Sequence, residues 1–76
     1  MELDLRDAIR LHRLIEIDAG GERFLVEPHG LSELEDGPSL RAFIVDGPRL
    51  GWSQFREWSN LTVTRSNFPR REAPTP

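Results

Sequence analysis

Arginine side chains are the groups in this sequence best suited to recognising a ligand. All ten basic residues are arginine and none is lysine, a bias that GC-rich coding also explains. Arg23, Arg41 and Arg56 fall on three different predicted strands. A guanidinium offers parallel N–H donors that match a phosphate or a carboxylate. Three guanidiniums that converge on one face would therefore hold the anionic group of a ligand.

Aromatic rings accompany these arginines. Phe43 shares a strand face with Arg41, because alternate residues of a strand point to the same side. Either Phe43 or Trp52 could stack on a base, although Trp52 is also expected in the core of so short a chain. His29 lies beside a bend, where it either faces the ligand or hydrogen-bonds the backbone. His12 is expected to pack on the apolar face of a helix.

A second interpretation of the arginines is ion pairing across strands, with acids such as Glu16, Glu27 and Glu57. Thirteen acidic residues against ten basic ones give a net charge of −3. This balance makes neutralisation easy and disfavours a broad surface that follows a phosphate backbone. The two interpretations differ in whether the three arginines share one concave patch.

Catalytic and metal chemistry find little support in the sequence. There is no cysteine, and no serine lies in a nucleophile-elbow motif. The two histidines lack the spacing of metal ligands. The acids Glu33, Glu35 and Asp36 fit a solvated turn better than a weak cation site. We therefore expect no enzyme activity, no catalytic residue, no metal and no cofactor.

One helix and about five short strands must position these side chains. Asp4 is a candidate N-cap for a helix over residues 2–13, with Asp7 in its first turn. Alternation of apolar residues predicts strands, one of which bends at 28–30, over residues 14–18, 23–34, 39–45, 51–57 and 61–64. The segment 39–45 is apolar on both faces and is therefore expected to be a central strand.

The chain length limits the fold to one small domain with a marginal core. The inward positions of the predicted strands are Ile15, Ile17, Phe24, Val26, Leu40, Ala42 and Ile44. Five strands in so short a chain suit a curled barrel that closes its own edges, with the helix over one mouth. We expect an α+β fold, mainly β, with a domain over residues 1–68 and a flexible tail over 69–76.

Several segments together resemble the WYL domain, an Sm-like barrel found mostly in bacterial transcription regulators. The pieces that carry the resemblance, in order, are residues 5–9 and 13–17, the bend at 26–31, the strand at 40–43, and the W-x-x-F-R strand at 51–56. The tripeptide that names the family would fall at 38–40, where only Leu40 matches. The basic turn that usually follows the F-R pair is replaced by residues 57–60.

The resemblance implies a strongly bent Sm/SH3-like small barrel that acts as an effector-type module without a helix-turn-helix of its own. By the same resemblance, the ligand would be an anionic nucleotide or a single-stranded nucleic acid. Arg41, with Arg56, Arg23 and His29, would hold the anion while Phe43 or Trp52 stacks.

The alternative function is a protein-interaction or oligomerisation module with a degenerate ligand pocket, in which exposed strand edges and Trp58 contact a protein partner or a second copy. No apolar run is long enough for a transmembrane helix, and no leader opens the chain. We therefore expect a cytoplasmic protein without a membrane partner.

Overall fold

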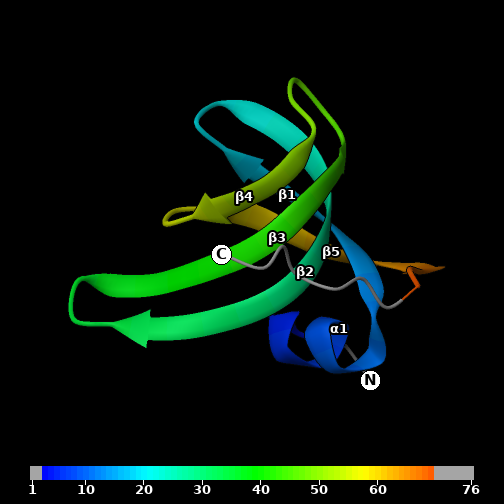
Figure 1. Ribbon diagram of the computed structural model, residues 1–76, viewed down its shortest axis with the longest axis horizontal. Helices are drawn as coiled ribbons and strands as arrows, with labels where there is room; N and C mark the ends of the chain where they lie inside the picture. The colour runs from blue at the N-terminus through cyan, green and yellow to red at the C-terminus, as the bar shows by residue number, and fades with distance from the viewer. Residues whose placement is uncertain (1–2, 70–76) are drawn as a thin grey trace.

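The N-terminal helix and the five strands are present, which confirms an α+β, mainly β fold (Figure 1). The computed structural model describes residues 3–69. In chain order the elements are α1 (Leu5–Leu11), β1 (Arg13–Ala19), β2 (Glu22–Leu34), β3 (Gly37–Asp46), β4 (Gly51–Phe55) and β5 (Ser59–Asn67). The strands form one antiparallel sheet in the order β4-β3-β2-β1-β5. The strand expected to be central, now β3, has a partner on both sides.

Helix α1 begins at the predicted cap but ends earlier than expected. The Asp4 carboxylate accepts the backbone N–H of Asp7 at 2.9 Å, and the Asp7 carboxylate accepts that of Asp4 at 3.2 Å. These bonds satisfy two amides that the first turn leaves without helical partners. At the other end His12 has a φ of 55°, the left-handed conformation that stops a helix. The helix therefore ends at Leu11, and His12 is its C-cap.

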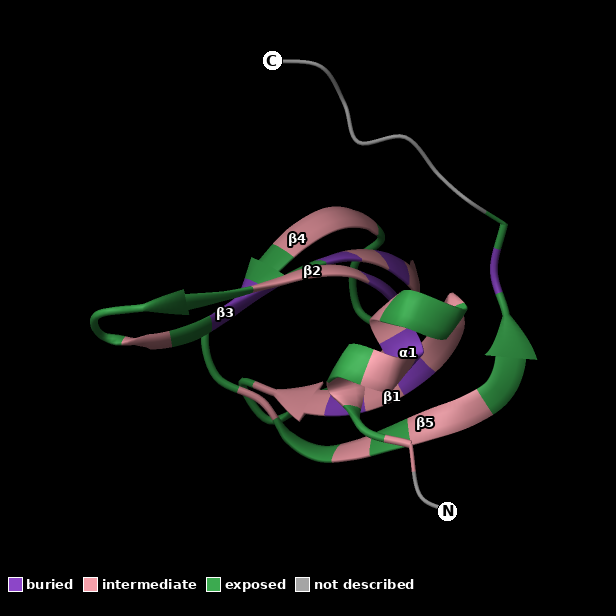
Figure 2. Cartoon of the chain, turned by 90° about the horizontal axis from the view of Figure 1, so that it is seen from below, coloured by how far each residue is buried: buried purple, intermediate pink, exposed green. Residues whose placement is uncertain are grey.

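Strand β2 runs unbroken through the predicted bend. Pro28 pairs with Ala42 and Gly30 pairs with Arg41, so one extra residue, His29, is inserted between two successive pairs. This is a β-bulge, which bends a strand without ending it. Beyond the bulge, β2 and β3 continue as a long hairpin arm, most of which is exposed (Figures 1 and 2).

The core lies on one face of the sheet and under the helix. All the inward positions expected from the alternation are buried, and Ala8 of α1 and Phe55 of β4 join them. Trp52, which was also expected in the core, is instead half-buried on the opposite face of the sheet, because it pairs with Phe43 and not with Leu40 or Ile44. The expectation that Trp52 belongs to the core is therefore wrong.

The sheet is bent, but hydrogen bonds do not close it into the expected barrel. Within residues 3–69, β4 and β5 are the two edge strands and do not pair with each other. Strand β4 ends at Phe55, two residues earlier than expected, whereas β5 extends from 59 to 67. The core is covered instead by partly buried apolar side chains packed against it: Leu5, Ile9, Ala19, Trp58, Leu61 and Val63.

Candidate functional site

A groove crosses the outer face of β2, β3 and β4, opposite the core. Its volume is about 620 Å³, and it is lined by Gly30, Leu31, Ser32, Ser39, Arg41, Trp52, Ser53 and Gln54. Register explains why these residues meet: Arg41 lies opposite Gly30 on one side and Gln54 on the other. Since Gly30 has no side chain, the space beside Arg41 stays open. We call this site the Arg41 groove.

The bulge in β2 places His29 against Trp52, one of the residues that line the groove. The Nε2 atom of His29 lies 3.1 Å from a carboxylate oxygen of Glu27, whose side chain is only 4% exposed. The His29 ring is 4.7 Å from the Trp52 ring and 5.2 Å from the Phe68 ring, centroid to centroid. Contacts on two sides fix the His29 ring, so it orients Trp52 more readily than it binds a ligand.

A row of rings leads from the helix end to the groove. His12 stacks on Phe68 at 5.3 Å, and on the far side of His29 the Trp52 ring meets Phe43 edge-to-face at 5.4 Å. Rings in this spacing favour tilted and edge-to-face geometry, and each pair adds stability beyond its buried area. The row therefore holds Trp52 in one orientation at the groove wall.

Arg41 is the charged group of the groove. Its guanidinium carbon lies 6.0 Å from the centre of the Trp52 ring, at the limit of a cation–π contact. Arg41 is exposed and forms no ion pair within residues 3–69. Beside it the Gln54 amide donates a hydrogen bond to the Ser39 hydroxyl. The site thus combines an unneutralised cation, a ring and neutral hydrogen-bonding groups.

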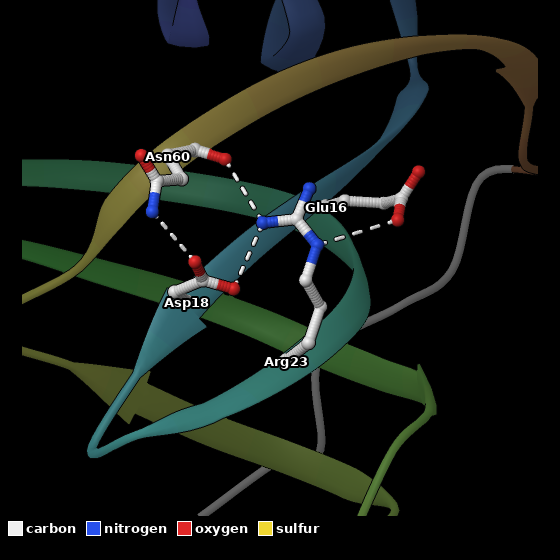
Figure 3. Close-up of polar contacts among 4 residues, drawn as sticks. All are labelled: Glu16, Asp18, Arg23 and Asn60. Carbon is white, nitrogen blue, oxygen red and sulfur yellow. Dashed lines mark hydrogen bonds and ion pairs between the residues drawn. The ribbon is translucent and has the colours of Figure 1, made fainter.

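Arg23 lies away from this groove, in a polar cluster where β1, β2 and β5 meet (Figure 3). Its guanidinium is 2.9 Å from a carboxylate oxygen of Asp18 and 3.5 Å from one of Glu16, and it donates to the Asn60 carbonyl at 3.1 Å. Hydrogen bonds from Arg23 first, and from the Asn60 amide second, hold the pKa of Asp18 below its ordinary value. Arg23 is occupied by acids, as the ion-pairing interpretation expects.

We expect this cluster to make stability depend on pH in the acid range. Asp18 has a lower pKa in the folded than in the unfolded protein. Its contribution to the free energy of unfolding is therefore fully present above pH 3.8, the ordinary pKa of this group, and is lost as the pH falls through the folded pKa. The Asp18→Asn variant should therefore show a shallower fall in the free energy of unfolding between pH 5 and pH 2.5, measured by urea titration at roughly those values. Salt at roughly 1 M should shrink the difference, because the pair is exposed. Equal slopes for wild type and variant would contradict this role of Asp18.

Arg56 and Trp58 also lie apart from the groove. Arg56 follows β4 and forms an ion pair at 2.5 Å with Asp36, at the tip of the β2–β3 hairpin. Trp58 is half-buried and packs against the core, so little of its ring is available to a partner. Of the predicted site residues, the structure brings together Arg41, His29, Phe43 and Trp52, and it places Arg23, Arg56 and Trp58 elsewhere.

Several residues of the site were missed from the sequence. Ser39 and Gln54 share a sheet face with Arg41, and for Ser39 the alternation along its own strand already carried that signal. Phe68, the last residue of the expected domain, is buried and its backbone N–H donates to the His12 carbonyl at 2.9 Å. No local pattern predicts this contact, because its partners, His12 and His29, are far away in sequence. The rest of the expected tail, residues 70–76, lies outside the described residues.

Other features bear on function more weakly. In residues 3–69 no three His, Cys, Asp or Glu side chains are arranged to hold a metal ion. No helix in this part of the chain is long and apolar enough to cross a membrane. Comparison of the chain with protein-family models, with curated proteins and with solved structures gives no match.

Proposed function

We propose that the Arg41 groove binds a small anionic ligand of nucleotide type, and that the chain is a non-enzymatic ligand-sensing or regulatory module. The observation that carries the proposal is the exposed Arg41 guanidinium, without an acidic partner within residues 3–69, beside the fixed ring of Trp52. A groove of about 620 Å³ is in the size range of small-molecule sites. The resemblance to the WYL domain points to the same ligand class.

Each part of such a ligand has a matching group in the groove. The Arg41 guanidinium would donate two parallel hydrogen bonds to a phosphate. The Trp52 face would stack on the base, a contact worth about 1–3 kcal/mol. Gln54 and the Ser32 hydroxyl would hydrogen-bond the sugar or the base edge, whereas the Ser53 hydroxyl already accepts a hydrogen bond from Arg49 at 2.6 Å. Because Arg23 and Arg56 are neutralised by acids, the arrangement favours one anionic group over a long nucleic-acid backbone.

We expect Arg41→Gln to weaken nucleotide binding more than tenfold, which corresponds to at least about 1.4 kcal/mol. The titration follows Trp52 fluorescence in a Trp58→Phe background, so that a single tryptophan reports. A nucleoside monophosphate, the matching nucleoside and a short single-stranded DNA are compared at one salt concentration.

The matched control is Arg56→Gln, which removes an exposed arginine that already has an acidic partner. The Arg56→Gln variant should bind the monophosphate with the same affinity as the Trp58→Phe parent. The nucleoside, which lacks the phosphate, should bind much more weakly to both of these proteins. Equal affinity of the Arg41→Gln variant and the parent would remove Arg41 from the site. Tighter binding of the single strand than of the monophosphate would replace the small ligand by nucleic acid.

A second candidate function is assembly through the open edges of the sheet. Strands β4 and β5 have a partner on one side only within the described part of the chain, and such edges pair readily with another strand. Since Trp58 packs on the core, the edges and not Trp58 would make the contact. A monomer in sedimentation equilibrium at roughly 50 µM, a concentration that reveals Kd values near that range, would contradict self-assembly.

A further inference from the structure

A second groove lies along β5, on a different part of the molecule from the Arg41 groove. It has a volume of about 440 Å³ and is lined by Leu3, Arg13, Leu61, Thr62, Val63, Thr64 and Arg65. Two arginines and two threonines line it, and among residues 3–69 no acidic residue does. The groove shares no lining residue with the Arg41 groove. We call it the Arg13–Arg65 groove.

Arg13 presents a buried N–H group without a partner. Its Nε atom is shielded from solvent and has no hydrogen-bond acceptor within residues 3–69. An unsatisfied buried donor costs about 1–3 kcal/mol, and more when it carries charge. Such a group in a folded protein calls for an explanation, and residues 3–69 supply no acceptor for it. Only the Nε atom is shielded in this way, so the terminal N–H groups of Arg13 are the donors that an anion in the groove can reach.

A bulge in β5 brings Arg65 to the same groove. Arg13 pairs with Asn67, and Ile15 pairs with Val63, so β5 has three residues where β1 has only Leu14. The Thr64 hydroxyl holds this bulge, since it donates to the Leu14 carbonyl at 2.8 Å and accepts the Ser66 backbone N–H at 3.1 Å. Arg65 is the middle residue of the bulge. Bulges commonly re-aim a side chain, and they are frequent beside binding sites.

The other described arginines have partners, which makes this pair stand out. Ion pairs with acids occupy Arg6, Arg10, Arg23 and Arg56. Arg41 and Arg49 contact aromatic rings. Within residues 3–69, the side chains of Arg13 and Arg65 have neither an ion pair nor a cation–π contact. Two guanidiniums that have no carboxylate partner within residues 3–69 therefore line one groove, where they can bind an anion from solution.

We propose that the Arg13–Arg65 groove is a second binding site, for the phosphate group of a small ligand. Two guanidiniums offer the donors that match a tetrahedral oxyanion, and the Thr62 hydroxyl at the groove wall adds a neutral donor. The site is independent of the Arg41 groove, so either site stands if the other fails.

The test follows the arginine Nε–Hε resonances of the full chain by NMR while inorganic phosphate is added at constant ionic strength. The Arg13 and Arg65 resonances should shift and saturate. Arg6, an exposed arginine paired with Glu33, should show no saturating shift and serves as the internal control. Acetate is titrated in parallel and should bind at least roughly tenfold more weakly than phosphate, a difference of about 1.4 kcal/mol.

Variants separate binding from folding. Arg65→Gln changes an exposed side chain and should weaken phosphate binding roughly tenfold or more, while Arg6→Gln should leave the phosphate affinity unchanged. Arg13→Lys keeps the charge but removes the parallel N–H donors of the guanidinium, and it should weaken phosphate binding while the rest of the spectrum stays that of the folded protein. Arg41→Gln should not alter phosphate binding here. Absence of saturation, an unchanged affinity in Arg65→Gln, or equal binding of acetate would each overturn the proposal.

Discussion

Replacing Leu40 by alanine is expected to remove about 2–5 kcal/mol from the free energy of unfolding. Leu40 is fully buried in β3, paired with Leu31 of β2 and Phe55 of β4, so the cavity would open in the middle of the sheet. A chain of this length is expected to have about 4–11 kcal/mol of stability in total. The variant should therefore lose a large share of its free energy of unfolding, as measured by urea denaturation followed by circular dichroism.

Leu50 offers a matched control for this change. It lies between β3 and β4 and is 71% exposed, so Leu50→Ala removes the same atoms from solvent and not from the core. We expect its effect to stay within about 0.5 kcal/mol. A similar loss of unfolding free energy in both variants would contradict the burial of Leu40 in the core.

Alternation along the chain was enough to predict seven buried apolar residues of β1, β2 and β3. In β3 the apolar residues Leu40, Ala42 and Ile44 alternate with Arg41 and Phe43, and a period of two fixes the two faces once one face is buried. The same logic placed Asp4 at the helix start, because a capping residue acts on amides three positions away. Features determined by neighbours in sequence could thus be predicted from it.

Features that depend on the order and register of the strands could not be predicted from the sequence. The sequence left Arg23 open between a patch shared with Arg41 and ion pairs with acids, and its position opposite Asp18 in the β1–β2 hairpin and beside Asn60 of β5 decides for the ion pairs. Phe68 is buried because strand β5 ends beside the helix terminus, where His12 stacks on it. Strand order and register decide both outcomes, and neither is written in a local pattern.

The Arg41 groove also combines a feature that could be predicted from the sequence with features that could not. Alternation predicted that Arg41 and Phe43 share a face, and that is observed. The arrival of Trp52 and His29 at this face depends on the β3–β4 register and on one extra residue in β2. The groove therefore relies on the turn that sets the position of β4, which pairs with β3 alone within residues 3–69.

Gly47, at the start of that turn, is expected to tolerate no side chain. Its φ is 144°, a region that only glycine adopts without strain, and a Cβ there would lie 3.0 Å from the Phe24 ring and 3.3 Å from the Arg23 carbonyl. The backbone strain costs about 1–3 kcal/mol, and displacement of the buried Phe24 adds about 1–3 kcal/mol. We expect Gly47→Ala to lose at least about 2 kcal/mol of unfolding free energy, measured by urea denaturation.

The Gly20→Ala variant shows how much of the loss of unfolding free energy comes from the backbone conformation alone, without a steric clash. Gly20 has a φ of 59°, in the left-handed helical region, and a Cβ there would meet no atom within 4 Å. Gly20→Ala should therefore cost only about 1–2 kcal/mol. In Gly47→Ala the Phe24 ring must move, so its NMR signals and those of Phe55, which it meets edge-to-face, should shift, and in Gly20→Ala they should not. Equal losses of unfolding free energy in the two variants, with unchanged NMR signals of Phe24 and Phe55, would mean that the β3–β4 turn does not contact the core closely. In that case β4 would be held in register only by its hydrogen bonds with β3.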